Sequence, residues 1–204
     1  MKRQFFRRIT LYALWLFAIG TATVSILDYE NASGSVGSAP EQWVFGTPVP
    51  LDPTRDTLIL FAHPRCPCTR ATLEDLNRVL AQSNGRIAAH VLFFSPAHYP
   101  ANWAHTELWR SAAAIPGVTV GEDTDNALAR EYGAATSGYV LLYNPRGELL
   151  FRGGITGSGD HDGDNVAERA IISLATGGSA TGTQTPVYGC SLFGGSNCQP
   201  GVVP

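Results

Sequence analysis

Two cysteines stand one residue apart in this sequence, Cys66 and Cys68, with Pro67 between them. An apolar run typical of a buried strand precedes them, and a segment with helical apolar spacing follows. Backbone N–H groups at the positive end of a helix stabilise a negative sulfur, so a thiol at such a junction has a lowered pKa. We therefore expect accessible, acidic thiols here, with Arg65 and Arg70 lowering the pKa further through their charge.

Thiol–disulfide exchange is the chemistry that this spacing favours. One thiolate attacks a disulfide, and a second thiol resolves the mixed disulfide. Cys68 lies closer to the helix start and Cys66 is expected to be more exposed, so the spacing leaves the attacking sulfur open. A disulfide closed across one residue is strained, and strained disulfides are the more oxidising ones. Cys190 is a candidate relay if the tail folds back over the site; alternatively it pairs with Cys198.

Two other interpretations use the same cysteines. Two thiolates and an imidazole, from His63 or His161, form a donor set suited to Cu(I). In the other interpretation, the four cysteines form two structural disulfides and the protein only binds partners. A cross-link over one residue stabilises a fold very little, which counts against that interpretation. The exchange reaction needs no cofactor, and we expect none.

The elements around the cysteines predict an α/β fold. A strand, a helix and a second strand come first, and the right-handed crossover rule makes the two strands parallel. A hairpin with good turn chemistry follows later and adds antiparallel strands at an edge. We expect a mixed sheet with helices on both sides. The expected strands are 57–62, 87–94, 118–120, 139–143 and 148–152. Four helices are expected. The first follows the cysteines and stops at Gly85, the second spans 103–114, the third runs from a cap at Asp123 or Thr124 to Tyr132, and the fourth spans 166–174.

The N-terminus predicts a membrane anchor. Basic residues fill the segment 1–8, and 9–27 is uncharged and long enough at 1.5 Å per residue to cross the ~30 Å hydrocarbon core. Basic residues before the apolar run place 1–8 in the cytoplasm and the rest on the periplasmic side of a bacterial cytoplasmic membrane, with a single pass. A cleaved signal peptide is the alternative, with a small-residue site at 20–22. The segment 28–56 is expected to be a tether and lead-in.

The charge beyond the expected anchor is acidic. All 17 Asp and Glu residues follow residue 27, whereas four of the 14 Lys and Arg residues precede it. Such a surface does not favour nucleic acid as a partner, because that binding depends on neutralising phosphates. Cysteines in an exported chain suggest disulfide chemistry, and two of the four lie in a Gly- and Pro-rich tail, 177–204.

The chain resembles the thioredoxin-like superfamily from about Trp43 to Thr176. The similar segments are Phe61-Ala62-His63-Pro64-Arg65-Cys66-Pro67-Cys68, Ala135-Thr136-Ser137-Gly138, Gly163-Asp164-Asn165 and Thr185-Pro186-Val187-Tyr188-Gly189-Cys190. Together they look like the membrane-tethered TlpA and peroxiredoxin-related branch, and like RedB-like proteins.

The resemblance implies a fold and an activity. The fold is a thioredoxin-like three-layer sandwich over 57–176, and the activity is thiol–disulfide exchange with exported proteins at Cys66 and Cys68. The implied supporting residues are His63, Arg65, Pro67, Thr136 and Ser137, the last two standing where the family has a cis-proline. Peroxiredoxins carry Thr or Ser three residues before the attacking cysteine, and here those places hold His63 and Arg65, which disfavours peroxide reduction.

Overall fold

The computed structural model describes residues 2–30, 33–34, 37–157, 166–180 and 182–193. Contacts divide the chain into two units, Met1–Ala32 and Ser33–Pro204. His161 and Cys198 lie outside the described residues, and so do the Gly163-Asp164-Asn165 motif and the end of the tail.

The first unit consists of one helix, α1, Lys2–Glu30. Its described side chains are exposed, and several of them are large and apolar, among them Trp15 and Phe17. The sequence predicted a membrane anchor over 9–27. Within the part of the chain that the structure describes, no helix is both long enough and apolar enough to span a membrane, so the structure does not support that prediction.

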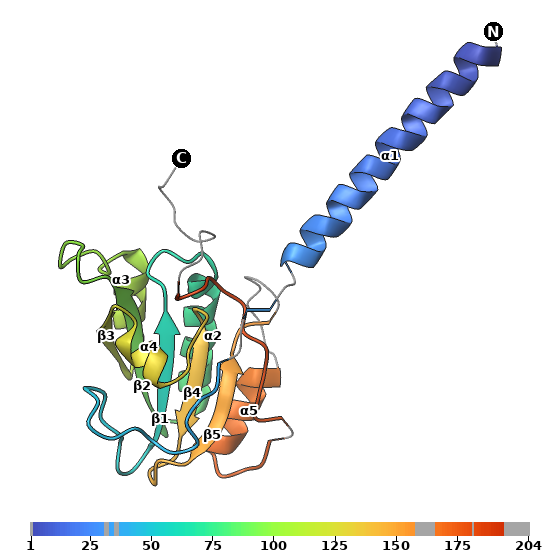
Figure 1. Cartoon of the computed structure of the whole chain (residues 1–204). Helices are drawn as coiled ribbons and strands as arrows, with labels where there is room; N and C mark the ends of the chain where they lie inside the picture. Colours follow the sequence, from blue (N-terminus) through green and yellow to red (C-terminus); the bar gives the residue numbers. More distant parts are fainter. Residues whose placement is uncertain (1, 31–32, 35–36, 158–165, 181, 194–204) are drawn as a thin grey trace. The chain divides into compact units, whose positions relative to one another are not determined.

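The second unit is built on a five-stranded sheet with the order β3-β2-β1-β4-β5 (Figure 1). Its central strand β1 pairs in parallel with β2 and antiparallel with β4, while β3 and β5 extend the two sides. The parallel pair and the antiparallel hairpin confirm the mixed sheet predicted from the order of elements. The strands are β1 Asp56–Ala62, β2 Ile87–Ser95, β3 Val118–Thr124, β4 Tyr139–Tyr143 and β5 Leu149–Gly154.

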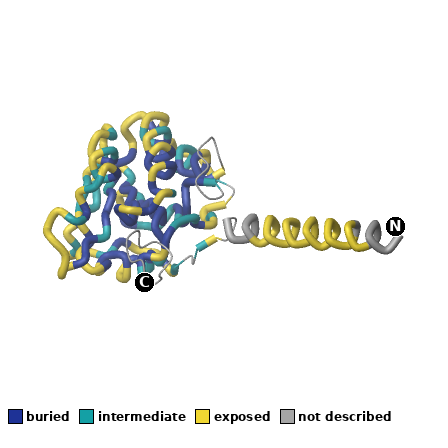
Figure 2. The backbone as a smooth tube through the Cα atoms, turned by 90° about the horizontal axis from the view of Figure 1, so that it is seen from above, coloured by how far each residue is buried: buried dark blue, intermediate teal, exposed yellow. Residues whose placement is uncertain are grey.

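Helices cover both faces of this sheet. Alternation along β1 sends Leu58 and Leu60 to one face and Ile59 and Phe61 to the other, so each face has its own apolar core. The first core packs against α2 (Cys68–Gln82), α3 (Glu107–Ala113) and α5 (Val166–Ala175). The second packs against α4 (Ala127–Glu131). Figure 2 shows the buried backbone at the centre of this unit. The predicted α/β architecture, a mixed sheet with helices on both faces, is confirmed.

Element boundaries differ from the sequence prediction at α3, which begins at Glu107 rather than at residue 103, and at β3. β3 runs on to Thr124 because it pairs with β2 along its whole length, Thr124 lying opposite Ser95. The Asp123 carboxylate at the end of this strand accepts the N–H groups of Leu128 and Ala129, each at 2.8 Å, and so caps α4 as the sequence predicted.

The lead-in and the tail complete the second core. Trp43 from the lead-in is buried and makes edge-on contacts with Tyr132 and Tyr143, at ring-centroid distances of 5.7 and 5.2 Å. Val187 and Leu192 from the tail are buried in the same core. On this face of the sheet, the short helix α4 is therefore supplemented by the lead-in before β1 and by the tail after α5. Their packing brings the tail to the carboxyl end of β1, where the cysteines lie.

Candidate redox site

A tight turn holds the two cysteines between β1 and α2. The Cys66 N–H donates to the His63 carbonyl at 3.1 Å, and the Thr69 N–H donates to the Cys66 carbonyl at 3.1 Å. Pro67 is exposed, with a φ of −57° that suits a helix start, and α2 begins at Cys68. The thiols therefore stand at a strand-to-helix junction, as the sequence predicted.

Both thiols are free, but their accessibility differs from the prediction. Cys66 has no exposed surface, whereas Cys68 is half-buried. The expectation that Cys66 is accessible, and the more exposed of the two, was wrong. The physical reason is the tail, whose backbone at Cys190 lies against the Cys66 sulfur on one side while Thr69 covers it on another.

The Cys66 sulfur accepts four hydrogen bonds. It accepts the S–H of Cys68, the backbone N–H of Cys190, the backbone N–H of Cys68 and the hydroxyl of Thr69. These bonds lower the pKa of Cys66 to about 6, the Cys68 S–H contributing most, although burial opposes the shift. The hydrogen bond between the two thiols therefore favours one negative charge shared by the Cys66–Cys68 pair.

The two arginines that flank the cysteines contact other side chains. The Arg65 guanidinium lies over the Trp103 ring at 4.7 Å, a cation–π contact. Arg70 forms an exposed ion pair with Glu107 at 3.6 Å. Hydrogen bonds, rather than these two charges, are the main causes of the lowered Cys66 pKa.

His63 is a buried residue that shapes the turn. Its ring packs between Phe94 and Trp103, at centroid distances of 5.7 and 5.8 Å, and its Nδ1 accepts the Arg65 N–H at 3.2 Å. Burial, reinforced by the Arg65 charge, lowers the pKa of His63 to about 4, so the imidazole is neutral at pH 7.

The structure gives the Cu(I) interpretation no third ligand. His63 Nδ1 is already engaged by a backbone N–H on its own turn, and His161 lies outside the described residues. Among the residues that the structure describes, no three His, Cys, Asp or Glu side chains gather in a group suited to a metal ion.

The segment predicted to lie opposite the thiols does lie there. The Ser137 hydroxyl accepts the His63 N–H at 2.9 Å and is 3.2 Å from the Thr69 hydroxyl. Thr136 is buried and forms an antiparallel bridge with Ser191 of the tail. Gly138, with a φ of +93°, follows them and donates its N–H to the Phe61 carbonyl at 2.8 Å. The supporting residues His63, Thr136 and Ser137 are thus brought together beside Cys66.

Cys190 is disulfide-bonded. Because Cys66 and Cys68 are both free, neither is its partner. The tail nevertheless folds back over the site as the relay hypothesis required, with the Cys190 backbone in contact with the Cys66 sulfur. The relay role of Cys190 stays a prediction.

Sequence reasoning missed a buried charged cluster behind the site. Asp75 on α2 and Glu168 on α5 are 0% and 1% exposed, and their carboxyl groups share a hydrogen bond. Arg78 forms ion pairs with both. Burial raises the pKa of Glu168 to about 7 against the opposing charge of Arg78. The available signal was the position of both acids within the apolar spacing of their helices.

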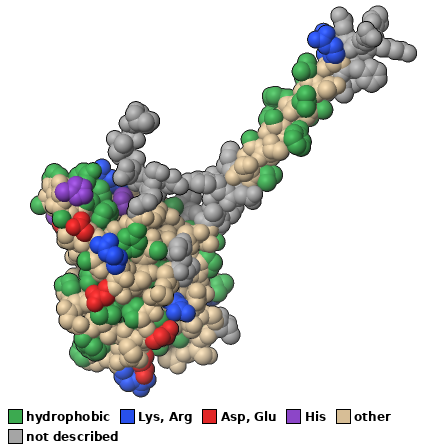
Figure 3. Space-filling view, viewed as in Figure 1, with side chains coloured by type: hydrophobic (Ala, Val, Ile, Leu, Met, Phe, Trp, Pro, Cys, Tyr) green, Lys and Arg blue, Asp and Glu red, His purple; other side chains and the backbone are tan. Residues whose placement is uncertain are grey.

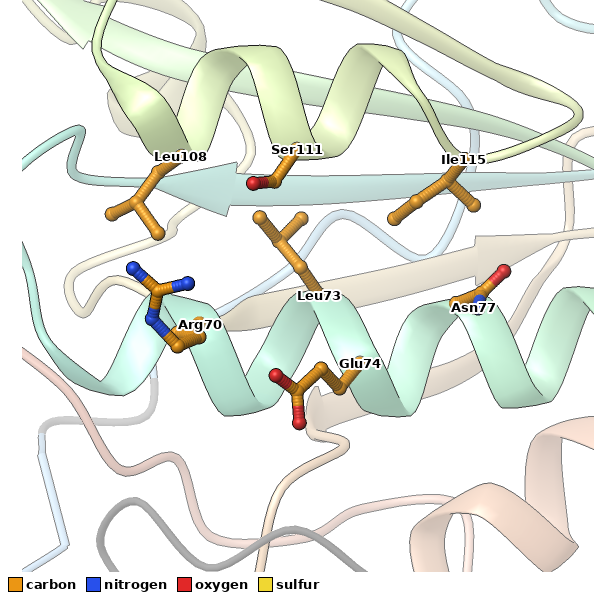
Figure 4. Close-up of a pocket in the computed structure, with 7 residues that line it drawn as sticks. All are labelled: Arg70, Leu73, Glu74, Asn77, Leu108, Ser111 and Ile115. Carbon is orange, nitrogen blue, oxygen red and sulfur yellow. The ribbon is translucent and has the colours of Figure 1, made fainter.

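The surface offers one shallow pocket away from the sulfurs. It measures about 130 Å³ and opens between α2 and α3, lined by Arg70, Leu73, Glu74, Asn77, Leu108, Ser111 and Ile115 (Figure 4). Neither cysteine lines it.

On the face seen in Figure 3, acidic and basic side chains are interspersed.

Comparison with known proteins shows the fold and not the activity. No family model and no curated protein matches the sequence. A hypothetical protein from Sinorhizobium meliloti 1021 superposes with a TM-score of 0.58 at 20% identity, covering 81% of this chain and 97% of that one. An uncharacterized conserved protein from Geobacillus kaustophilus gives 0.58 at 19% identity, covering 81% and 94%. StoA from Bacillus subtilis gives 0.44 at 15% identity, covering 72% and 98%. The chain is therefore similar in fold to the first two proteins, over nearly their whole length.

Proposed function

We propose that this protein is a thiol–disulfide oxidoreductase that exchanges disulfides with protein substrates through Cys66 and Cys68. The observation that carries the proposal is the Cys66 sulfur itself, which accepts the Cys68 S–H and three further hydrogen bonds and has a pKa of about 6. Thiol–disulfide exchange requires a thiolate at ambient pH and a second thiol within reach, and this pair supplies both.

The exposure of the two sulfurs assigns their roles while the tail is in place. Cys68 is half-buried and Cys66 is covered, so a substrate reaches Cys68. Cys68 attacks one sulfur of the substrate disulfide, its proton passes to Cys66, and the other substrate sulfur leaves as a thiolate. Cys66 then attacks the Cys68 sulfur of the mixed disulfide and gives its proton to the departing substrate sulfur. The products are a Cys66–Cys68 disulfide and a reduced substrate, and the reverse sequence oxidises a substrate.

We further propose that the domain acts on exported proteins outside the cytoplasmic membrane. Two features support this compartment: the basic residues that precede an uncharged N-terminal stretch, and the exposed apolar side chains along α1. A reporter active only outside the cytoplasm, fused after residue 33, tests it. Activity is the expected result, and a reporter active only in the cytoplasm contradicts the proposal.

Trapping of a substrate by single-cysteine variants tests the reaction. The full chain is reduced, mixed with a protein disulfide such as insulin, and quenched with acid before mapping without reductant. Cys66→Ser should accumulate a mixed disulfide at Cys68, because the resolving sulfur is gone. Cys68→Ser should trap at least tenfold less of the substrate.

The matched control is Arg70→Ala, which keeps both thiols and alters only an exposed ion pair. It should cycle like the unmodified chain. If Cys66→Ser and Cys68→Ser both turn over the substrate at the unmodified rate, the proposed function is wrong.

A further inference from the structure

Complete burial of Cys66 limits what can react with it. Hydrogen bonds to its sulfur come from Cys68, Thr69 and the backbone of Cys190. Of these residues, Cys190 alone carries a disulfide. An acidic thiol without access to solvent is therefore held against a residue whose side chain is a disulfide, a functional group that thiolates attack.

The tail reaches this position as an added strand. We call residues 187–192 the strap. Its Cys190 carbonyl accepts the Ser137 N–H at 2.8 Å, and its Leu192 N–H donates to the Ala135 carbonyl at 2.9 Å. Ser191 forms an antiparallel bridge with Thr136 between these bonds. Pairing of this kind resembles the way a substrate peptide adds to a free backbone edge, with affinity coming from main-chain hydrogen bonds.

The sequence of the strap permits this close approach. Gly189 lies so near the loop that a Cβ there would come within 2.1 Å of the Ser137 carbonyl oxygen, so only glycine fits. The two ends of the strap are fixed by the burial of Val187 and Leu192, and the Asn126 side chain donates to the Leu192 carbonyl at 2.5 Å. Cys190 is held between these anchors and is 6% exposed.

The hydrogen bond between Cys190 and Cys66 brings their sulfurs within reach of each other. The sulfur of a cysteine is three bonds from its own amide nitrogen, and a rotation about χ1 moves it around that nitrogen. With the Cys190 N–H bonded to Cys66 Sγ, the Cys190 side chain begins beside that sulfur, and rotation about χ1 sets the separation of the two sulfurs.

We propose that the Cys190 disulfide is an internal substrate of Cys66, which the strap holds in the position of a bound peptide. The proposal rests on the proposed function, and it names the first exchange partner of the site as part of the same chain. Cys198, the remaining cysteine of the sequence, is the partner that the proposal assigns to Cys190.

The exchange balances without an outside reagent. The Cys66 thiolate attacks the Cys190 sulfur, a Cys66–Cys190 bond forms, the tail S–S bond breaks, and the Cys198 sulfur leaves as a thiolate. Cys68 then attacks Cys66, its proton passes to the tail, and a Cys66–Cys68 disulfide and a tail dithiol result. One pair is oxidised by two electrons and the other is reduced by two.

Strain decides which pair holds the disulfide at rest. A disulfide across Pro67 closes a very short loop and is the more oxidising of the two. The equilibrium therefore favours free thiols at Cys66 and Cys68 and a disulfide at Cys190, which is the arrangement in the structure.

Two variants of the full chain test the proposal. In Cys68→Ser, the resolving sulfur is absent and the Cys66–Cys190 intermediate should persist. In Cys68→Ser/Cys198→Ser, only Cys66 and Cys190 remain, and oxidised glutathione should join them within the chain. Each protein is held at pH 7.5, quenched with acid, alkylated and mapped by mass spectrometry without reduction. We expect at least tenfold more Cys66–Cys190 linkage in either variant than in the unmodified chain.

The matched controls carry Gly189→Ala in addition, which should displace the strap and abolish the linkage. If the linkage is absent from both test variants while circular dichroism shows them folded, the proposal is overturned. Failure of the proposed function is a separate result. Cys190→Ser/Cys198→Ser has no internal substrate, yet oxidised glutathione should still convert it to the Cys66–Cys68 disulfide, and loss of that reaction contradicts the proposed function rather than the role of the strap.

Discussion

The Ser137 hydroxyl accepts the backbone N–H of His63 at 2.9 Å, across 74 residues of sequence. This bond joins the turn that carries the cysteines to the loop that carries the strap, since the Ser137 N–H also donates to the Cys190 carbonyl. Ser137 is 1% exposed, so water does not replace the bond when it is lost.

Ser137→Ala should destabilise the domain and loosen the site together. Removing the hydroxyl leaves the buried His63 N–H without its acceptor, which costs about 1–3 kcal/mol. Urea unfolding of the reduced chain measures the loss. Thr176→Ala, which removes an exposed hydroxyl at the end of α5, is the control and should change stability by less than about 0.5 kcal/mol. Equal effects of the two substitutions contradict the role given to Ser137.

Titration of the thiolate tests the acidity of Cys66. Thiolate absorbance near 240 nm should rise in the reduced chain with a midpoint at about pH 6, and that step should be missing in Cys66→Ser. Because the folded pKa lies below the value of 9.0 for an ordinary thiol, ionised Cys66 stabilises the native state. That stabilisation is complete above about pH 9 and is lost as the pH falls through 6. A first midpoint above pH 8 contradicts the hydrogen-bonding account.

Gly189→Ala should expose Cys66. The added methyl group cannot fit against the Ser137 carbonyl oxygen, so the strap must move away from the sulfur that it covers. N-ethylmaleimide should then modify Cys66 at least tenfold faster than in the unmodified chain, as peptide mapping measures. Gly20→Ala is the control, because a Cβ at Gly20 meets nothing within 4 Å. An unchanged rate shows that the strap does not control access.

The Asp75–Glu168 cluster predicts a stability that falls as the pH rises. The pKa of Glu168 is about 7 in the folded protein against 4.5 for an ordinary glutamate. A raised folded pKa gives stability that is present below about pH 4.5 and is lost as the pH rises through 7. Glu168→Gln should therefore flatten the decline between pH 5 and pH 8 by about 1 kcal/mol.

Chemical denaturation at the two pH values measures this decline. Glu74→Gln, which changes an exposed acid on α2, should leave the pH profile of the unmodified chain in place. A pH profile that is the same in Glu168→Gln as in the unmodified chain rules out the proton uptake assigned to Glu168.

The pattern of apolar residues along the chain was sufficient to predict most helices and strands and the position of the two thiols between them. The three inner strands β1, β2 and β4 appear in the sequence as short apolar runs, because they are buried on both faces of the sheet. The strand-to-helix junction at Cys66 was equally visible, since helical apolar spacing begins directly after it. The prediction of an acidic thiol holds for Cys66, but its largest cause is the Cys68 S–H, and another cause is the backbone of Cys190 in the distant tail.

Burial at the site could not be predicted in this way. The strap lies more than 100 residues from Cys66 in sequence, and its pairing with Ala135 and Ser137 is made by backbone groups that every residue possesses. The contact between Asp75 and Glu168 could not be predicted either, because they lie on α2 and α5, which are far apart in sequence and meet only in the folded domain. The sequence by itself located both thiols at a strand-to-helix junction, because that junction arises within one short stretch of chain. Tertiary structure alone decided what covers Cys66, because contacts between distant segments depend on how the two cores close.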